Sequence, residues 1–428
     1  MATVVLLWWC QVRGVVGGET YVAISSDRAM FAGLLSASES VLLGTRRPAW
    51  LRLVIVVPQH EEVKVEKALR CALEGSFLLG ESCSGNTSRA FAGRGHWYET
   101  SSGARWSVVG FRATRHRHEV VASGHHQRLT SPFNYARLYL HKLPACWLPA
   151  EVERLVYLDA DVYALGDVVE LSTFVATPGW RIAAVTRPYR AVCETLINCK
   201  HPRVRAALLE KGIGDVEAEL LDFNAGVMAY NVNAWREDAG LLKELESWIR
   251  LNRDIPIFKL GTNPPLVLTV RRSGIAPLDA RWNCQDFDRS KRETRACDRA
   301  DIIHYSGAQK PWHLAPNESA AMSWRLPSRS RACVYDFSRL GVKVRRNKRP
   351  PTDFIGPGMP THLLKEHIKK GDIPGLKGKA TTRTKTTTTE LHRRRRKSSP
   401  PVAARDAPRP RHAPPPPRRR HSHVVAAD

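Results

Sequence analysis

The sequence has 428 residues, of which 43% are hydrophobic, and its formal net charge is +25. This length is enough for one large domain or two smaller ones. The nine cysteines include no Cys-x-x-Cys pair, so no zinc framework is indicated, and no hydrophobic run approaches the roughly 20 residues that span a bilayer.

The first segment, residues 1–19, is short and contains the apolar run Val4–Trp9. This run is too short to span a bilayer and lacks a basic flank. Two interpretations stay open: the remnant of a signal or anchor segment, or the lead-in to the first strand.

Strand and helix patterns alternate from residue 20 onwards. The apolar run 20–27 ends in small polar residues and Asp27, and a helical period follows from 31 to 43. The buried-type run 51–57 stops at Pro58, and a second helical period covers 61–73. This order predicts a parallel sheet of the nucleotide-binding type.

The region that follows is mixed. Residues 79–104 are rich in Gly, Ser and Thr, which indicates a surface loop or insertion. Residues 105–110 read as a strand, and 132–143 read as a helix that carries Arg137.

Two carboxylates end the next strand. The apolar run 154–158 leads directly into Asp159 and Asp161. Strand side chains alternate between faces, so both carboxylates should lie on one face at the edge where open α/β sheets bind ligands. Two hard oxygen donors suit Mn²⁺ or Mg²⁺, completed by phosphate oxygens. The alternative for an isolated Asp-x-Asp is a turn or a cap.

Small polar residues interrupt a later strand. Asn224, Ala225 and Gly226 lie inside the apolar run 223–231, which indicates close approach of a ligand, or alternatively a β-bulge. The other elements expected in this part of the chain are a strand at 182–185 and helices at 204–209 and 241–249.

A third polar block follows the apolar pair Ile302 and Ile303. His304 offers an imidazole, a common ligand for Mn²⁺-type ions, although a structural histidine is the alternative. Gly307 allows the backbone to approach a ligand closely, and Lys310 can neutralise phosphate charge. The combination of this block with Asp159 and Asp161 predicts a metal and phosphate site.

The high charge belongs mostly to the C-terminal tail. Residues 343–428 hold 23 Lys and Arg against 6 Asp and Glu, a net of +17, which leaves +8 for the rest. This composition predicts a basic, Pro/Arg/Thr-rich disordered tail after a folded domain at 20–342. Such a tail either contacts anionic membrane or polysaccharide or is a solvated extension.

Deletion of residues 343–428 should leave the melting temperature and the activity of residues 20–342 almost unchanged, because the tail has no apolar periodicity to pack. Binding to polyanions should weaken in a salt-dependent way. Thermal unfolding of the truncated and full chains tests this expectation, and a large drop in melting temperature would show that the tail belongs to the folded body.

These motifs, in this order, resemble family 8 of the retaining glycosyltransferases, and its plant galacturonosyltransferase-like branch in particular. The resemblance covers roughly residues 20–325 and rests on five blocks, listed here in chain order: Ile24–Gly33, Asn134–Arg137 with Leu155–Asp161, Phe223–Met228, Asn263–Leu266 with Arg281–Asn283, and His304–Trp312.

The resemblance implies a GT-A type α/β fold, with a mixed, mostly parallel central sheet flanked by helices. It also implies a UDP-sugar donor, Mn²⁺ (or Mg²⁺) as cofactor and a glycan or polysaccharide acceptor. Carried over by position, the metal ligands are Asp159, Asp161 and His304, and the residues facing the diphosphate and sugar are Arg137 and Lys310. Those implied to bind the donor are Ser26, Asp27, Ala160, Asn224, Ala225, Gly226 and Gly307.

Two positions depart from the family pattern. Met30 stands where an aromatic residue commonly stacks on uracil, and thioether packing replaces that stack only in part. Asn263-Pro264-Pro265 replaces the acidic-amide pair of bacterial members, so no nucleophile is identified. The configuration at the anomeric carbon is then expected to be retained by front-face attack of the acceptor within an ion pair.

Two other classes of protein compete with this interpretation. A polyanion- or nucleic-acid-binding protein explains the basic tail but not the three motif blocks, so nucleic acid is not the expected partner. Another metal-dependent nucleotide-processing enzyme explains Asp159 and Asp161 but not the block from His304 to Trp312.

The expected compartment is the Golgi or secretory lumen. Two N-glycosylation sequons, at Asn86 and Asn317, are compatible with it, although such short motifs arise often by chance. Cys193 and Cys199 are close enough in sequence to be bridged, as are Cys284 and Cys297, but spacing alone does not determine disulfide pairing.

Overall fold

The computed structural model describes residues 18–313, except for 28–29, 74, 85–89, 93, 113–131, 175, 177, 260, 286–298 and 308–309. The tail, both sequons, Cys297 and most of the segment 1–19 therefore lie outside the described residues, and the domain boundaries stay predictions. Within the described ranges, no helix has the length and apolarity needed to cross a membrane.

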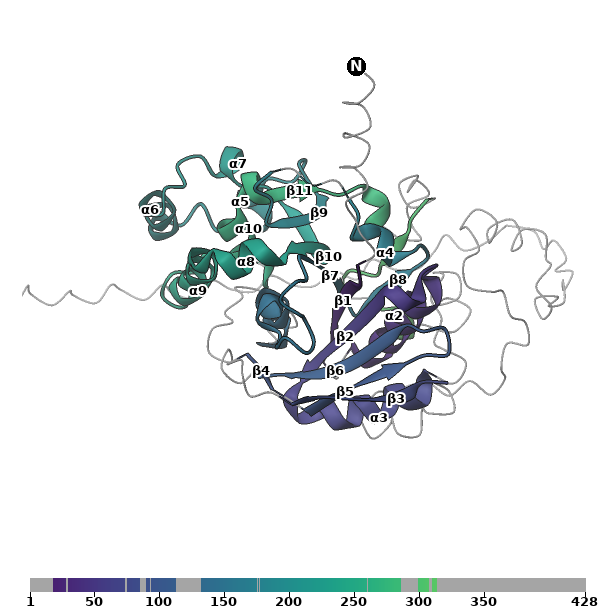
Figure 1. Cartoon of the computed structure of the whole chain (residues 1–428). Coiled ribbons are helices and arrows are strands. Elements are labelled where there is room, and N and C mark those ends of the chain that lie inside the picture. The colour runs from purple at the N-terminus through teal and green to yellow at the C-terminus, as the bar shows by residue number, and fades with distance from the viewer. Residues whose placement is uncertain are drawn as a thin grey trace, which may run out of the picture. The chain divides into compact units, whose positions relative to one another are not determined.

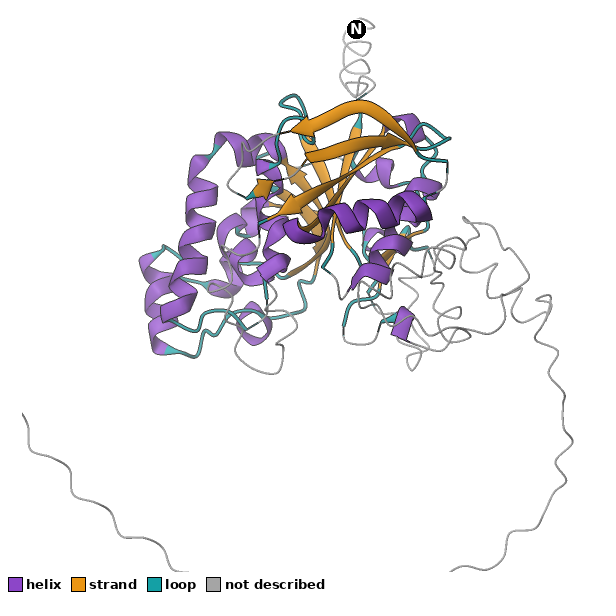
Figure 2. Cartoon of the chain, turned by 90° about the horizontal axis from the view of Figure 1, so that it is seen from below, coloured by secondary structure: helices purple, strands orange, loops and turns teal. Residues whose placement is uncertain are grey.

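A ten-stranded sheet forms the centre of the fold (Figures 1 and 2). Its strand order is β11-β9-β10-β7-β1-β2-β6-β5-β3, and β4 pairs with β6 off this path. The strands are β1 (Thr20–Ser25), β2 (Leu51–Pro58), β3 (Phe77–Ser84), β4 (Phe91–Ala92), β5 (Arg94–Glu99), β6 (Arg105–Phe111), β7 (Arg154–Asp159), β9 (Ile182–Thr186), β10 (Phe223–Asn231) and β11 (Ile275–Pro277).

Most of these strands share one direction. The central strands β7, β1, β2 and β6 pair in parallel, whereas β10, β5 and β4 run the opposite way. The predicted mixed, mostly parallel α/β sheet is confirmed.

Helices cover both faces of the sheet. The α-helices are α2 (Phe31–Gly44), α3 (Glu62–Ala72), α4 (Val168–Leu171), α5 (Val192–Thr195), α6 (Pro202–Glu210), α7 (Val216–Glu219), α8 (Val232–Glu237), α9 (Ala239–Asp254) and α10 (Asn263–Val270). The 3₁₀ segments are η2 (Pro48–Trp50), η3 (Gln59–Glu61), η6 (Pro132–Lys142), η7 (Arg272–Gly274), η8 (Ala280–Trp282) and η10 (Pro311–His313). The helix predicted at 132–143 is thus a 3₁₀ helix.

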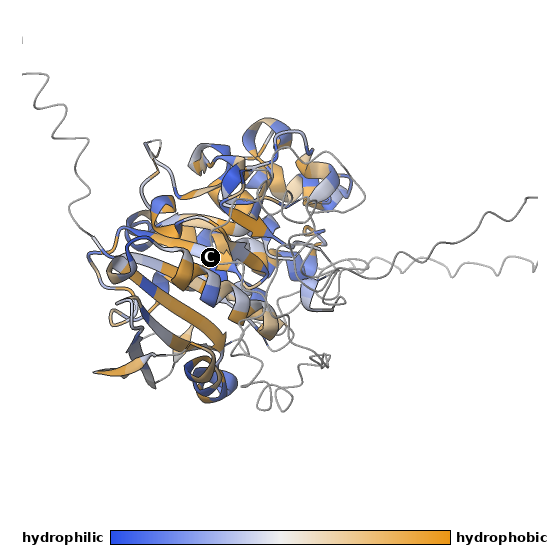
Figure 3. Ribbon diagram, turned by 90° about the vertical axis from the view of Figure 1, so that its right-hand side faces the viewer, coloured by the Kyte–Doolittle hydropathy of each residue, from blue (hydrophilic) through white to orange (hydrophobic). Residues whose placement is uncertain are grey.

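Side-chain alternation in the strands separates two hydrophobic cores. In β1, Tyr21 and Ala23 belong to one buried cluster, and Val22 and Ile24 belong to the other. The first cluster is completed by η6 and α8–α10, and the second by α2 and α3. Figure 3 shows the strands between these layers as predominantly hydrophobic, as expected for strands buried on both faces.

The prediction of a surface loop at 79–104 is wrong, because this region contributes β3, β4 and β5 to the sheet. Its glycine content was misleading. A Cβ atom on Gly95 would lie 2.5 Å from the Trp147 ring and 2.6 Å from the Val108 carbonyl oxygen. This glycine permits close packing inside a strand and does not mark a loop.

A separate two-stranded sheet joins distant parts of the chain. β8 (Val162–Ala164) follows Asp161 directly and pairs antiparallel with β12 (Ile302–His304). In this register His304 lies opposite Val162, and the Tyr305 amide donates to the Asp161 carbonyl at 2.8 Å. The pairing therefore brings the third sequence block to the end of β7.

One buried histidine should make stability depend on pH. His141 stacks on Trp235 with ring centroids 5.3 Å apart, and neither ring nitrogen has a hydrogen-bond partner among the described residues. Burial, followed by the charges of Lys142 and Arg236, lowers the pKa of His141 to about 3.

The neutral form of His141 is thus favoured in the fold, whereas the unfolded chain takes up a proton below about pH 6.5. Its stabilising contribution is complete above that pH and is lost as the pH falls, by about 1 to 2 kcal/mol at pH 5. Chemical denaturation at pH 7 and pH 5 should show a smaller loss for His141→Phe than for the wild type. Equal losses would contradict the assignment.

Candidate functional site

Three predicted ligand groups converge beyond the end of β7. The Nε2 atom of His304 lies 3.3 Å from Asp161 Oδ1 and 3.9 Å from Asp159 Oδ2. The candidate ligand atoms of all three residues lie within 4.8 Å of one another. Two carboxylate oxygens and an imidazole nitrogen form a donor set that fits Mn²⁺ or Mg²⁺.

Asp159 and Asp161 lie close together, but they are not two residues on one face of the same strand, as strand alternation predicts. Asp159 is the last residue of β7, but Asp161 lies in the turn after it. The turn leads into β8, so Asp161 is held beside His304 by the β8–β12 pair. The predicted proximity is found, and the turn that was weighed as an alternative is part of it.

Each carboxylate is held by a cationic side chain. The Oδ1 atom of Asp159 lies 2.9 Å from the Arg137 guanidinium and accepts a 2.5 Å hydrogen bond from the Tyr157 hydroxyl. The Oδ2 atom of Asp161 pairs with the Lys310 ammonium, which also donates to the Tyr305 carbonyl at 2.7 Å. The oxygens nearest to His304 are Asp161 Oδ1 and Asp159 Oδ2, and the latter also accepts from Arg137 at 3.5 Å.

The ionisable side chains of this site are buried, so each one affects the pKa values of its neighbours. Asp161, His304, Lys310 and Arg137 are each no more than 9% exposed. Burial alone would raise the pKa of Asp161, but interactions with His304 and Lys310 outweigh it and hold that pKa below its ordinary value. Burial raises the pKa of Tyr157 well above its ordinary value, so its hydroxyl remains a donor.

Arg137 links this site to the strand predicted to bind the donor. Its guanidinium donates to the Ala225 carbonyl at 3.2 Å, and its own carbonyl accepts from the Tyr230 hydroxyl at 2.7 Å. Both partners lie in β10, which is antiparallel to β7. The amino-terminal end of β10 therefore lies at the sheet edge where β7 ends.

Gly226 is required by close packing against His304. A Cβ atom at this position would lie 2.1 Å from His304 Cε1. The pairing of β10 with β9 also shifts register between Phe223 and Met228, so the irregularity weighed as an alternative is present. The Asn224 side chain stabilises it by accepting a 2.7 Å hydrogen bond from the Gly226 amide.

Gly226→Ala should therefore displace His304. A shift of about 1 Å in a ligand can cost about 100-fold in rate, and we expect a loss of that order in transfer, together with weaker Mn²⁺ binding. Gly80→Ala is a matched control, because Gly80 also lies in a strand and has no atom within 4 Å of the added Cβ. Wild-type Mn²⁺ affinity in Gly226→Ala would contradict this packing argument.

The other predicted donor residues lie near the same edge. Ser26 and Asp27 follow β1, whose last residue, Ser25, is in register with Asp159. Ser26 is buried and donates to the Asp27 carbonyl at 3.0 Å. Gly307 adopts a positive φ of 102°, which glycine tolerates best.

Ala160 contacts α2 through its backbone carbonyl group. A Cβ atom on Gly33 would lie 2.4 Å from the Ala160 carbonyl oxygen and 2.6 Å from the Trp312 ring. The first turn of α2 therefore packs against two features of the site. One is the turn at Ala160, between Asp159 and Asp161, and the other is the Trp312 side chain.

Two further basic residues, Arg187 and Arg190, are differently placed. Arg187 donates to Asp222 Oδ1 at 3.1 Å and to the Phe223 carbonyl at 2.8 Å, so its charge is already compensated. Arg190 is exposed and lies over the Tyr189 ring at 5.9 Å.

Sequence reasoning missed two residues of the site. Tyr157 bonds to Asp159, and Asn283 contacts His304 Nδ1 at 2.9 Å. The alternation of β7 could have indicated Tyr157, because it lies two residues before Asp159 on the same strand face. No local pattern marks Asn283 as a partner of a histidine 21 residues away.

The chain is similar to known proteins over part of its length. The glycosyl transferase family 8 model matches residues 108–315. The chain is 29% identical over 198 residues to probable galacturonosyltransferase-like 3 of Arabidopsis thaliana, covering 45% of this chain and 53% of that protein. It is 31% identical over 201 residues to probable galacturonosyltransferase-like 2 of the same plant, covering 45% and 55%. The chain thus spans about half the length of these curated relatives.

Among solved structures, the chain is similar to the galactosyltransferase LgtC in complex with donor and acceptor sugar analogues. The sequence identity is 18% and the TM-score is 0.46, and the match covers 77% of this chain and 98% of that one.

Proposed function

We propose that this chain, a member of glycosyl transferase family 8 through its residues 108–315, transfers a hexosyl or uronosyl group from a UDP-sugar to a glycan acceptor. The family match and the mixed, mostly parallel sheet confirm the predicted GT-A type fold. The observation that carries the proposed activity is the convergence of Asp159, Asp161 and His304 beside two buried cationic side chains.

The residues suit departure of a diphosphate. Asp159, Asp161 and His304 would hold Mn²⁺, which supplies a Lewis acid for phosphate oxygens when bound. Negative charge develops on UDP as the anomeric bond breaks, and Lys310 and Arg137 provide fixed positive charge in a buried setting. The Asn224–Gly226 segment lies against His304 and would contact the donor sugar. We propose retention by front-face attack, with the acceptor hydroxyl entering on the side that UDP leaves.

The proposed donor is UDP-galacturonate, with UDP-xylose, UDP-glucose and UDP-galactose as competitors. Support comes from the similar proteins of Arabidopsis thaliana, which are named probable galacturonosyltransferase-like proteins. A uronate carboxylate needs an additional cation near the sugar. Arg190 suits this role better than Arg187, because Arg187 is bound to Asp222. The proposed acceptor is a cell wall polysaccharide such as pectin.

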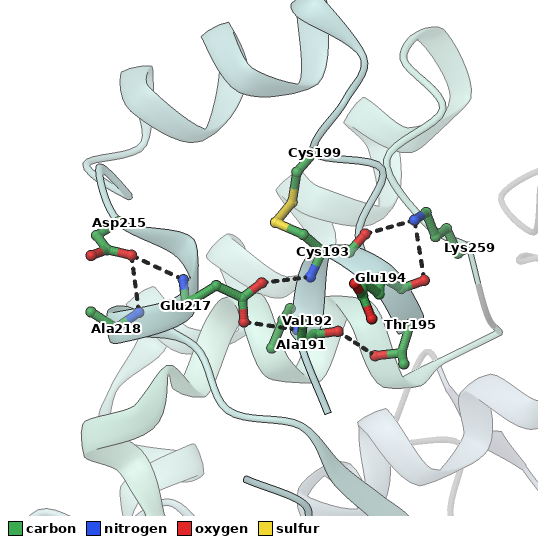
Figure 4. The surroundings of a disulfide bond; sticks show 10 residues. All are labelled: Ala191, Val192, Cys193, Glu194, Thr195, Cys199, Asp215, Glu217, Ala218 and Lys259. Atoms are coloured by element: carbon green, nitrogen blue, oxygen red, sulfur yellow. Dashed lines mark hydrogen bonds between the residues drawn. A yellow bond between two sulfur atoms is a disulfide. The ribbon is translucent and has the colours of Figure 1, made fainter. Parts of the chain in front are cut away.

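We place the enzyme in the secretory lumen, with the Golgi as the proposed site. Support comes from two disulfides, Cys83–Cys146 and Cys193–Cys199, because such bonds persist in oxidising compartments. Cys193 lies in α5, and Glu217 and Lys259 hold the backbone of this helix by hydrogen bonds beside the Cys193–Cys199 disulfide (Figure 4).

Release of UDP from the four UDP-sugars, measured with Mn²⁺ and with EDTA, tests the proposal. We expect release from at least one sugar and none with EDTA. Absence of release from all four, with phosphate or pyrophosphate released from nucleoside triphosphates instead, would favour the rival nucleotide-processing enzyme.

A further inference from the structure

Asn283 lies between the candidate metal ligand His304 and the strand proposed to bind the donor. Its Oδ1 atom is 2.9 Å from His304 Nδ1, and its Nδ2 atom is 3.2 Å from Asn224 Oδ1. Asn283 is 3% exposed and His304 is 2% exposed, so water has little access to these contacts. We propose that Asn283 is a positioning residue that fixes the proton of His304 and couples the metal site to the donor strand; this rests on the proposed function.

The backbone holds Asn283 and His304 next to each other. Asn283 directly follows η8 as its C-cap, and its amide donates to the Ala280 carbonyl at 3.1 Å. The next residue, Cys284, donates to the Ile302 carbonyl at 3.0 Å and accepts from the His304 amide at 2.8 Å. Residues 283–284 thus run beside β12, and the side-chain contact follows from this pairing.

The direction of the hydrogen bonds can be worked out from one backbone amide. The Gly226 N–H can only donate, so the Asn224 atom that it contacts must be the carbonyl oxygen Oδ1. An acceptor at Asn224 requires the facing atom of Asn283 to be the amide nitrogen. The other end of Asn283 is then an oxygen, which accepts from His304 Nδ1–H.

In the tautomer with its proton on Nδ1, His304 presents a lone pair at Nε2. That lone pair points to the region shared by Asp161 Oδ1 and Asp159 Oδ2, which are acceptors as well; Asp159 Oδ2 also accepts from Arg137 at 3.5 Å. Three acceptors that face one another suit a cation bound between them. The chain Gly226–Asn224–Asn283–His304 therefore sets the tautomer that a metal ligand requires.

Two substitutions can test the two side-chain contacts of Asn283 individually. Asn283→Asp keeps an acceptor for His304 but turns an oxygen towards Asn224 Oδ1 and the Asn224 carbonyl oxygen. Mn²⁺ affinity in the presence of UDP should be retained, while the KM for the UDP-sugar rises about tenfold from loss of one well-placed hydrogen bond. Asn283→Leu removes both contacts, and Mn²⁺ affinity should fall by about 10- to 100-fold as well.

The measurements are Mn²⁺ titration by electron paramagnetic resonance with UDP present, UDP-sugar kinetics, and the exchange-protected Nδ1–H resonance of His304 in the metal-free protein. The wild type and Asn283→Asp should show this resonance, and Asn283→Leu should lose it. Asn252→Leu is the matched control, since Asn252 is a buried asparagine on α9 that bonds to the Phe258 amide. It should lower stability but not alter Mn²⁺ affinity.

The inference would be overturned if Asn283→Asp and Asn283→Leu lowered Mn²⁺ affinity equally and raised the KM for the UDP-sugar equally. A protected His304 resonance that survives in Asn283→Leu would overturn it as well. If the wild type bound no Mn²⁺ with UDP, the proposed function would fail, and the metal half of this inference with it. The Nδ1–H resonance would still decide whether the relay exists, because it needs no metal.

Discussion

Asp161→Asn should abolish both sugar transfer and donor hydrolysis while leaving the fold intact. The amide is nearly the same size as the carboxylate but lacks the charge that would hold the cation. It also leaves the buried Lys310 without its anionic partner. We expect activity to fall by at least about 1,000-fold, since both the metal site and the position of Lys310 are affected.

Asp215→Asn is the control for this variant. Asp215 caps α7 by accepting from two backbone amides, and asparagine caps a helix equally well. Activity and melting temperature should both remain at wild-type values in the control. Near wild-type turnover of Asp161→Asn at saturating Mn²⁺ would remove Asp161 from the metal site.

Lys310→Ala should lower kcat by about 100-fold, with a smaller change in the KM for the acceptor. The ammonium group is buried and held by Asp161 and the Tyr305 carbonyl, so its charge is fixed before UDP departs. Lys310→Arg should recover only part of the loss, because a planar guanidinium cannot reproduce these contacts of a compact ammonium.

Lys310→Ala and Asp161→Asn should differ in metal binding. Removing Lys310 frees Asp161 Oδ2 and leaves both carboxylates charged, so Mn²⁺ affinity should be retained or increased. Lys211→Ala is the control, because Lys211 bonds to Ser247 on α9 instead of to a site residue. A change confined to acceptor KM, with kcat intact, would place Lys310 outside the donor site.

The site residues that the sequence predicts best are those that lie at the ends of strands. An apolar run followed by a polar residue locates a sheet edge, which is why Asp159 and His304 could be selected from the sequence. Asn224 was selected for a different reason, because it interrupts an apolar run. The βαβα opening followed from the same hydrophobic periods, and β1, α2, β2 and α3 formed close to the predicted bounds.

What the sequence could not supply depends on contacts between distant residues. The role of Asn283 arises only once residues 283–284 run beside β12. The close packing of Gly226 on His304 is invisible until both strands are placed, as is that of Gly95 on Trp147. Glycine was therefore misread as flexibility at 79–104, where its small size allows tight packing.

The β8–β12 pair also has a consequence for the order of folding. Val162 and His304 are in register although 141 residues separate them, and closing so long a loop is entropically costly and slow. During synthesis the sheet strands β1 to β7 emerge well before β12 and can pair while the ribosome is still producing α9 and α10. The nascent chain can thus hold a largely formed sheet and still lack His304 and Lys310, so the capacity to bind a cation should be acquired at the end of folding.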